Sequence, residues 1–314
     1  MTSDEVQKLI ATVENNIASV VFGKKNVIRQ CLVALLAGEH ILLEDVPGLG
    51  KTLLARAIAK SINGDFHRLQ FTPDLLPADI TGSSIYNADT REFQFVPGPI
   101  FANVFLADEI NRTTPRTQSA MLEAMNECQV SAEGQTYPLP QPFLVVATEN
   151  PVEFEGTYPL PESQLDRFLL RISVGYPDRE SELQVLKSHR FGQPIDAMTP
   201  VLSCEQVLEL QESVKQVKVN DAIDHYILDI VEITRRSEDL YVGVSTRGAI
   251  AFSHAVQAYA LIEGRDYAIP DDVKTLAVPV LAHRVMAKTY SHTNQRQAVE
   301  GLIAHLVDGV AVPT

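Results

Sequence analysis

Short apolar runs alternate with amphipathic segments along residues 1–178. Continuous apolar runs of this length are typical of strands that are buried on both faces of a parallel sheet. The segments 52–62 and 117–126 have the spacing of helices that separate such strands. The alternation predicts an α/β domain with a largely parallel sheet. Five strands are expected, at 41–43, 67–71, 104–107, 143–147 and 168–172.

Two segments interrupt this alternation. Residues 83–98 have two short strand-like arms around 87–90, and residues 127–139 have a turn signal at 133–134. Both patterns predict β-hairpins that are inserted into the α/β domain. The alternative for each segment is an ordinary surface loop.

The pattern becomes helical in the second half of the chain. Ser203 followed by Gln206 has the spacing of a capping box, and Ser245 and Gly264 have the positions of the cap and the stop of one long helix. Four apolar residues mark one face of a further helix: Ile223, Ile227, Ile230 and Val231. We therefore expect an α/β domain at 1–178, a linker at 179–200 and a small all-helical domain at 201–314.

Composition narrows the class of protein. The formal net charge of −14 disfavours direct binding to nucleic acid, because an acidic surface repels phosphate backbones. Cys31, Cys128 and Cys204 are far apart, as is typical of reduced thiols. The N-terminal segment lacks the apolar core of a secretory signal, and no apolar run approaches the ~20 residues that a membrane span needs. A soluble, cytoplasmic protein without a membrane span is expected.

The segment LLEDVPGLGKT follows the first expected strand and opens the first expected helix. Its spacing, Asp45-x-x-x-x-Gly50-Lys51-Thr52, matches the phosphate-binding loop, except that Asp45 replaces the first glycine. We expect this replacement to be tolerated because Asp adopts left-handed backbone more readily than most residues. Gly48 and Gly50 allow backbone amides to converge on a polyphosphate beside the amino end of the helix. Lys51 would reach the β- and γ-phosphates and Thr52 would bind Mg²⁺. The alternative is a structural glycine turn.

Polar residues end the third and fourth expected strands. Asp108 is placed to hold Mg²⁺, usually through its waters, and Glu109 is placed to deprotonate a water that attacks the γ-phosphate. Asn150 is placed to position the same water by hydrogen bonding. The alternatives are a solvated acidic strand end, and an asparagine that ends a strand before a proline turn.

Two arginines are candidate cations for the same chemistry. Arg167 lies just before the fifth expected strand, and Arg247 lies in the first turn of the helix that Ser245 begins. An arginine near a transferring phosphoryl group contributes about 10³–10⁵ in rate. Taken alone, each residue has the alternative of a surface salt bridge.

Five strings in chain order resemble those of the AAA+ ATPases: VPGLGKT, FLADEINR, ATENP, LPESQLDRF and GVSTRGAI. The strings FTPDLLPADITG and ENPVEFEGTYPLPESQLDRF, with the hairpin at 83–98, narrow the resemblance to the MoxR family. It covers nearly the whole chain and is most specific in the central strings. The resemblance implies an AAA+ P-loop domain with a five-stranded parallel sheet and β-hairpin inserts, followed by a helical lid domain.

The resemblance implies which residues hold the nucleotide. Lys51 and Thr52 match the Walker A pair, and Asp108 and Glu109 match Walker B. The implied nucleotide-binding loop comprises Pro47, Gly48, Leu49, Gly50, Lys51, Thr52 and Leu53. The segment that packs near the adenine comprises Val21, Phe22 and Gly23.

The resemblance also implies how ATP is sensed and cleaved. Asn150 matches sensor 1, Arg167 matches the arginine finger that is donated to the neighbouring subunit, and Arg247 matches sensor 2 in the lid. The hairpin at 83–98 resembles an insert that faces the central pore of such rings. Glu149 departs from the family pattern, which more often has Gln there, and places an extra carboxylate beside the sensor.

A Mg²⁺-dependent ATP hydrolase follows from this resemblance. Family members form homo-oligomeric rings, commonly hexamers, and act as chaperone-like motors that assemble or activate other protein complexes. A protein with a von Willebrand factor A domain is the expected adaptor. Three alternatives stay open: a switch in the manner of a GTPase, although the chain has no NKxD string; a nucleotide-gated, non-catalytic scaffold; and a magnesium-chelatase-like AAA+ motor subunit.

Overall fold

The five apolar runs of the first half form one parallel sheet in the computed structural model, which describes residues 3–89, 91–132, 134–151, 156–288 and 295–313. The strands are β1 (Ile41–Glu44), β2 (Phe66–Gln70), β5 (Val104–Asp108), β8 (Leu144–Glu149) and β9 (Leu170–Ile172). Their order across the sheet is β2-β5-β8-β1-β9, and each neighbouring pair is parallel. The predicted five-stranded sheet is confirmed, and its strand ends differ from the expected ones by one or two residues.

Alternate residues of these strands enter two separate cores. On β1, Ile41 and Leu43 lie in one core and Leu42 lies in the other. Residues of α1 (Ser3–Ala18), α2 (Lys25–Ala37) and α3 (Lys51–Ser61) complete the first core, and residues of α5 (Pro115–Glu127) complete the second. Because both faces of β1, β5 and β8 are covered, most positions of these strands are apolar, and this produces the unbroken apolar runs in the sequence.

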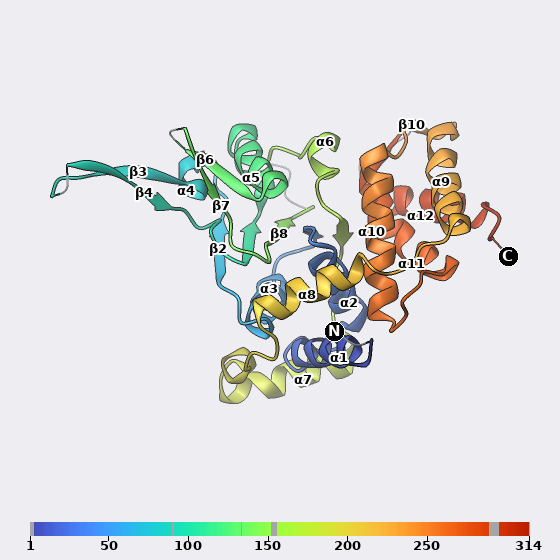
Figure 1. Cartoon of the computed structure of the whole chain (residues 1–314), viewed down its shortest axis with the longest axis horizontal. Helices are drawn as coiled ribbons and strands as arrows, with labels where there is room; N and C mark the ends of the chain where they lie inside the picture. Colours follow the sequence, from blue (N-terminus) through green and yellow to red (C-terminus); the bar gives the residue numbers. More distant parts are fainter. Residues whose placement is uncertain (1–2, 90, 133, 152–155, 289–294, 314) are drawn as a thin grey trace.

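Two antiparallel hairpins leave this domain where the sequence predicts them. β3 (Gly82–Asn87) pairs with β4 (Glu92–Pro97), and β6 (Gln129–Ala132) pairs with β7 (Gln135–Pro138). The first hairpin follows the short helix α4 (Pro77–Thr81) and projects away from the rest of the molecule (Figure 1). The hairpins are joined at their bases because Phe95 stacks on Tyr137 with ring centroids 4.0 Å apart. Three predicted parts, Thr90, Glu133 and the stretch 152–155, lie outside the described residues.

The segment expected to be a linker contains helices. Asp178 caps α7 (Arg179–Ser188), and the 3-10 helices η2 (His189–Phe191) and η3 (Pro194–Ala197) follow it. The next helix, α8 (Cys204–Val214), begins at the predicted capping box of Ser203 and Gln206. It packs against α2 and also against α10 (Thr246–Ile262), a helix of the C-terminal part. The domain boundaries at 178 and 201 therefore stay a prediction.

Four further helices form most of the C-terminal part: α9 (Asp221–Arg236), α10 (Thr246–Ile262), α11 (Pro270–Leu281) and α12 (Gln295–Asp308). Ser245 caps α10 by accepting a hydrogen bond from the amide of Gly248 at 2.9 Å. This part also contains two short strands that we did not expect, β10 (Leu240–Val242) and β11 (Met286–Ala287), with the 3-10 helix η4 (Ala282–Arg284) before β11. Runs of two or three residues leave no periodic signal in a sequence.

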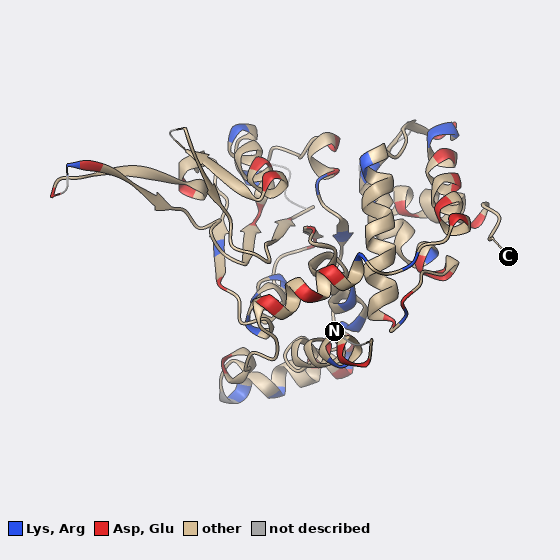
Figure 2. Ribbon diagram, viewed as in Figure 1, with Lys and Arg blue, Asp and Glu red and all other residues tan. Residues whose placement is uncertain are grey.

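A single apolar core joins the C-terminal helices to the first face of the sheet, since both contribute to the same cluster of buried side chains. The two parts lie side by side in Figure 1. Acidic residues mark the outer surfaces of α8 and α9 (Figure 2). Among the described helices, none is both long and apolar enough to cross a bilayer.

Candidate active site

The predicted phosphate loop lies at the carboxyl edge of the sheet, between the end of β1 and the start of α3. Gly48 and Gly50 both have φ of +86°, which is costly for residues with a side chain, and a Cβ on either would stand in open space. Pro47 and Leu49 flank Gly48 in this loop. No side chain caps the amino end of α3, so its first amides are available to an anion. The loop therefore fits a phosphate group.

Lys51 occupies the centre of this edge. It is buried, and its Nζ donates hydrogen bonds to the carbonyl oxygens of Asp45 at 2.6 Å and Glu149 at 3.4 Å. Burial lowers the pKa of Lys51, while the carboxylates of Asp108, Asp45 and Glu109 oppose that shift. The structure thus brings the predicted Walker A lysine close to both predicted Walker B carboxylates. Thr52 and Leu53 follow in the first turn of α3, half-buried.

Asp45 holds the loop to the chain segment after β9. Its Oδ2 accepts hydrogen bonds from the Oγ of Ser173 at 2.9 Å and from the amide of Gly175 at 2.7 Å. Its backbone is not left-handed, so the expectation that Asp45 is admitted for its left-handed tolerance is wrong. The residue is accommodated because its carboxylate has partners that a glycine could not bind.

The Asp108 carboxylate lies at the end of β5 and accepts three hydrogen bonds from its neighbours. Its Oδ1 accepts a hydrogen bond from the Oγ1 of Thr148 at 2.6 Å. Its Oδ2 accepts hydrogen bonds from Arg68 on β2, at 2.7 Å from Nη2 and 3.1 Å from Nε. A carboxylate beside Lys51 and Thr52 suits Mg²⁺, which prefers oxygen ligands and keeps several waters. Arg68 occupies the same carboxylate and would compete with a cation there.

Glu109 has left-handed backbone, with φ of 58° and ψ of 52°. Such a conformation costs of order 1–3 kcal/mol in a residue other than glycine and is concentrated at functional sites. The amide of Glu109 donates to Thr148 Oγ1 at 2.9 Å, which fixes the turn. Its Oε2 lies 2.6 Å from Gln70 Nε2 and 2.8 Å from Arg112 Nε. Two donors therefore hold the carboxylate that the sequence assigns to water activation.

Asn150 follows β8, the strand between β5 and β1, and is buried. The ends of three adjacent strands thus carry Asp108, Asn150 and the phosphate loop. Glu149 lies directly beside Glu44 in the register of β8 and β1. Burial and the charge of Glu44 raise the pKa of Glu149 to about 7, although Arg171 opposes the shift.

The segment predicted to contact adenine lies near this edge. Val21 is buried, Phe22 is half-buried, and Gly23 has φ of +69°. A Cβ on Gly23 would come within 2.1 Å of Ser181 Oγ, so the segment abuts the start of α7. Lys24 donates to the carbonyl of Tyr176 at 2.8 Å, close to the loop that Asp45 binds. Residues 173–178 therefore connect the phosphate loop with this segment.

Arg167 and Arg247 lie at the opposite, amino edge of the sheet. Arg167 precedes β9, and its Nη1 donates to the carbonyl of Leu122 on α5 at 2.7 Å. Arg247 is exposed and donates to Asn126 Oδ1, one turn further along α5, at 2.5 Å. The structure brings the two arginines together and does not bring them to the Lys51 edge of the same chain.

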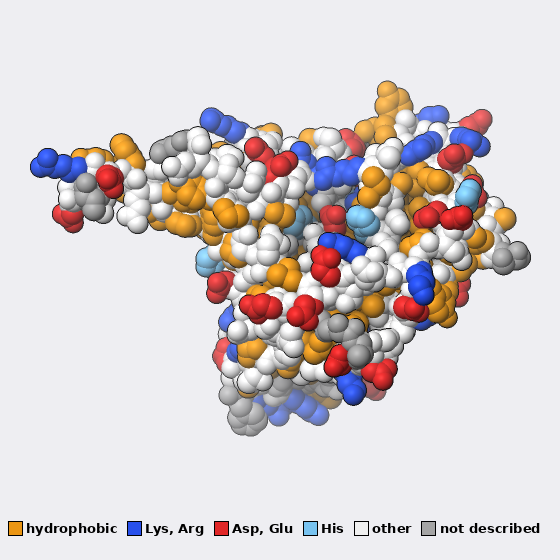
Figure 3. Space-filling view, in the orientation of Figure 1, with side chains coloured by type: hydrophobic (Ala, Val, Ile, Leu, Met, Phe, Trp, Pro, Cys, Tyr) orange, Lys and Arg blue, Asp and Glu red, His pale blue; other side chains and the backbone are white. Residues whose placement is uncertain are grey.

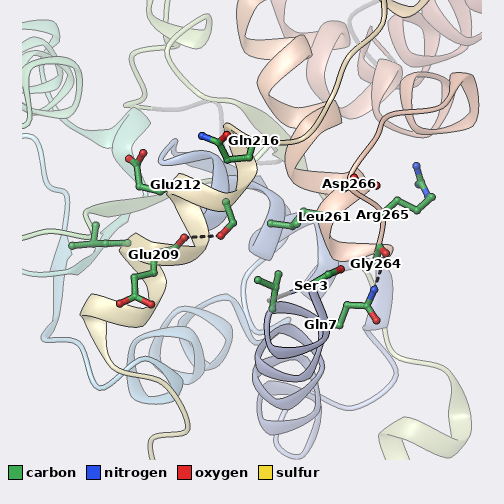
Figure 4. A pocket seen from close by; sticks show the side chains of 12 residues that line it. Ser3, Gln7, Glu209, Glu212, Gln216, Leu261, Gly264, Arg265 and Asp266 are labelled. Carbon is green, nitrogen blue, oxygen red and sulfur yellow. Dashed lines mark hydrogen bonds between the residues drawn. The ribbon is translucent and has the colours of Figure 1, made fainter. Parts of the chain in front are cut away.

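A cavity of about 570 Å³ lies elsewhere, between the start of α1, α8 and the end of α10 (Figure 4). Gln7 lines one side of it and donates to the carbonyl of Gly264 at 2.7 Å. Its lining includes Glu209, Glu212 and Asp266 but none of the predicted site residues. This cavity is therefore separate from the predicted nucleotide site.

The partners of the two Walker B residues, Asp108 and Glu109, were not predicted from the sequence. Arg68 and Gln70 are polar residues in β2, an edge strand that reaches the same carboxyl edge as β5. The polar side chains of Arg68 and Gln70 within an expected strand were the signal that this strand lies at the edge of the sheet, because an edge strand has one side free of neighbours. Arg112, three residues after Glu109, had the spacing of a local ion pair.

Comparisons with known proteins agree with this arrangement. The model of the ATPase family associated with various cellular activities (AAA) matches residues 40–170, and that of the AAA lid domain matches residues 232–301. A crystal structure of a Cytophaga hutchinsonii protein, assigned as an ATPase, has a TM-score of 0.89 at 39% identity. The match covers 99% of this chain and 97% of the Cytophaga hutchinsonii chain.

Three curated relatives extend over most of the chain. The Bacillus subtilis protein YeaC, named as uncharacterized, is 50% identical over 99% of this chain and 97% of its own length. Chaperone MoxR1 of Mycobacterium tuberculosis is 42% identical over 94% of this chain and 80% of its own. Protein MoxR of Methylorubrum extorquens is 30% identical over 96% of this chain and 95% of its own length. The chain therefore belongs to the MoxR family of AAA ATPases, which bind nucleotide.

Proposed function

We propose that this protein is a Mg²⁺-dependent ATP hydrolase that works as a homo-oligomeric ring, with each ATP bound by one protomer and cleaved with arginines of the next. The observation that carries the proposal is the separation of its charged groups. Lys51, Asp108 and Glu109 lie at the carboxyl edge of the sheet, and Arg167 and Arg247 lie at the amino edge.

The strands set the distance between these edges. β1 has four residues, which span roughly 13 Å at about 3.3 Å per residue. Neither arginine approaches the phosphate loop of its own chain across that distance. A second copy whose amino edge faces this carboxyl edge would bring both arginines to the bound triphosphate. Head-to-tail contacts of this kind close into rings, and a hexamer is the size that the family resemblance favours.

Each residue of the carboxyl edge has a separate task in this proposal. Lys51 and the amides from Gly48 to Leu53 bind the β- and γ-phosphates. Thr52 and Asp108 would hold Mg²⁺, which supplies charge neutralisation between the phosphates when it is bound. Glu109 accepts the proton of the attacking water, and Asn150 orients that water.

Val21, Phe22 and Gly23 would receive the adenine. The position of this segment next to residues 173–178, which contact the phosphate loop through Asp45, supports the assignment. Three free cysteines are typical of a reducing compartment, so we place the protein in the cytoplasm as part of the same proposal.

A chaperone-like role in assembling or activating another protein complex is the proposed use of the ATP energy. The relative from Mycobacterium tuberculosis is named a chaperone, which supports this role. The projecting hairpin β3–β4 carries exposed apolar side chains, seen along the arm in Figure 3: Ile85, Tyr86, Phe93 and Val96. Such a surface suits contact with another polypeptide. A protein with a von Willebrand factor A domain is the proposed adaptor between this hairpin or the lid and the client.

Mass measurement in solution tests the proposal. Wild type with ATP and Mg²⁺ should form a ring and release phosphate, and Glu109→Gln should form the ring and retain ATP. Arg167→Ala should bind ATP in each protomer without turning it over. A wild-type ring that releases no phosphate would favour a scaffold, and near-normal turnover by Glu109→Gln would remove Glu109 from the role of base.

A further inference from the structure

The side chain of Arg284 is buried between the two elements that carry Arg167 and Arg247. It lies in η4, and its guanidinium donates to the carbonyls of Phe168 at 2.7 Å and Leu169 at 2.9 Å, directly after Arg167. Its aliphatic part lies against Gly248, directly after Arg247, where an added Cβ would come within 2.9 Å of Arg284 Cδ. The side chain of Arg284 therefore contacts the chain neighbours of both Arg167 and Arg247, the two surface arginines.

Asp166 forms the second half of this connection. Its Oδ1 accepts a hydrogen bond from Arg284 Nε at 2.8 Å, and its Oδ2 accepts one from the Oγ of Ser245 at 3.0 Å. Ser245 is also the cap of α10, the helix whose first turn holds Arg247. Asp166 is adjacent to Arg167 in the chain. The carboxylate thus joins the segment of one surface arginine to the helix of the other.

The two surface arginines are close enough to influence each other. Burial and the nearby charge of Arg247 lower the pKa of Arg167, with Glu123 opposing the shift. Both guanidiniums also bind α5, at Leu122 and Asn126. Two like charges repel, so contacts with the surrounding chain must hold the two guanidiniums in place.

We propose that Asp166 and Arg284 are positioning residues that hold Arg167 and Arg247 at one fixed spacing, so that both engage the triphosphate of a neighbouring copy together. This inference rests on the proposed function of a ring with shared sites. A buried, planar guanidinium with several acceptors has one arrangement, unlike a lysine on a flexible stem. Correct placement matters because an error of about 1 Å in a catalytic group costs roughly 10²-fold in rate.

A purely structural role for the same contacts makes different predictions. Arg284 also links the lid to the sheet, so its loss would lower stability in either case. If the role is positioning, a variant protomer fails only in the arginines that it supplies to its neighbour. Its own phosphate loop still binds ATP and can cleave it with intact arginines from another protomer. The tests therefore use Arg284→Lys, which keeps the charge, and Asp166→Asn, which keeps the shape.

Arg265→Lys is the matched control. Arg265 makes an equally close ion pair within the lid, at 2.8 and 2.5 Å from the two oxygens of the buried Asp272, and contacts neither surface arginine. Arg284→Lys and Asp166→Asn should lower kcat roughly 10- to 100-fold and leave nucleotide affinity within about twofold. Arg265→Lys should leave both within about twofold, although thermal unfolding shifts in all three.

Assemblies mixed from two variants distinguish the positioning role of Asp166 and Arg284 from the shared-site function of the ring. Glu109→Gln supplies intact arginines but cannot cleave its own ATP. Mixed with Asp166→Asn or with Arg284→Lys, it should restore turnover above that of either variant alone. The reference mixture is Glu109→Gln with Arg167→Ala.

If the reference mixture recovers activity and the Asp166→Asn and Arg284→Lys mixtures do not, the positioning role is wrong. Wild-type kcat in both single variants would overturn it equally. If the reference mixture itself fails to recover, the shared-site function is wrong, and the positioning role falls with it.

Discussion

Gln70 donates a hydrogen bond from Nε2 to Oε2 of Glu109 at 2.6 Å, across the gap between β2 and β5. The same oxygen pairs with Arg112 at 2.8 Å. Two donors on one carboxylate oxygen occupy lone pairs that a water would need. In this conformation Gln70 and Arg112 compete with the water that Glu109 is proposed to activate.

Gln70→Leu should therefore raise basal ATP turnover. The hydrogen bond contributes about 1 kcal/mol, which corresponds to roughly fivefold in rate. Phosphate release at saturating ATP and Mg²⁺ measures the effect, with Gln94→Leu on the projecting hairpin as the control. An unchanged or lower rate would mean that Gln70 does not restrain Glu109.

Arg68→Gln should lower the Mg²⁺ concentration that gives half-maximal turnover. Arg68 pairs with Asp108 at 2.7 Å and competes with the cation for the same carboxylate. Since Arg68 is half-exposed, water screens the pair, and the gain is about two- to fivefold. A magnesium titration at fixed ATP checks this, and a higher requirement for Mg²⁺ in the variant would contradict it.

Glu149→Gln should stabilise the protein at alkaline pH. The pKa of Glu149 is raised to about 7 in the folded chain, so the folded state binds more protons than the unfolded state between about pH 4.5 and 7. The contribution of Glu149 to stability is therefore full at low pH and is lost as pH rises to about 7. The variant should gain roughly 1–3 kcal/mol in the free energy of unfolding at pH 8 and little at pH 5.

Urea unfolding of both proteins across this range measures the difference. His40, whose pKa burial lowers to about 4, destabilises the fold as pH falls from about 6.5. It acts equally on wild type and variant, so the difference between them isolates Glu149. A difference that does not grow from pH 5 to pH 8 would show that Glu149 is an ordinary carboxylate.

Asp45→Gly restores the glycine that the phosphate-loop pattern has at this position. The variant should nevertheless be less stable, by roughly 1–3 kcal/mol, because Ser173 and Gly175 lose a charged hydrogen-bond acceptor. Thermal unfolding without nucleotide checks the loss. An equal or higher midpoint would show that these contacts add nothing.

Much of the fold was predictable because burial on both faces of the sheet leaves a strong local signal. The runs 41–43, 104–107 and 143–147, within or next to β1, β5 and β8, are apolar throughout. The caps Ser203 and Ser245 each accept a hydrogen bond from an amide three residues later, which is a fixed spacing. The phosphate loop was predictable for the same reason, since its chemistry lies within eight consecutive positions. Features whose groups are close together in the sequence can therefore be predicted from the sequence.

Relationships between distant segments were not predictable. Nothing in the segments around Gln70 and Glu109 indicates that they meet, because the meeting depends on the strand order. The place of Arg247 beside Arg167 depends on how the lid packs, and Arg284, which contacts the neighbours of both, lies 37 positions beyond Arg247. Such contacts become visible only when the tertiary arrangement is known.

The central claim is that one protomer binds the ATP that the next protomer's arginines help to cleave. The most direct measurement is phosphate release from a mixture of Glu109→Gln and Arg167→Ala, each nearly inactive alone. Mixing should restore turnover, because an intact loop and Glu109 from one chain meet an intact Arg167 from the other. A mixture no more active than its components, in assemblies shown by mass to contain both chains, would contradict it.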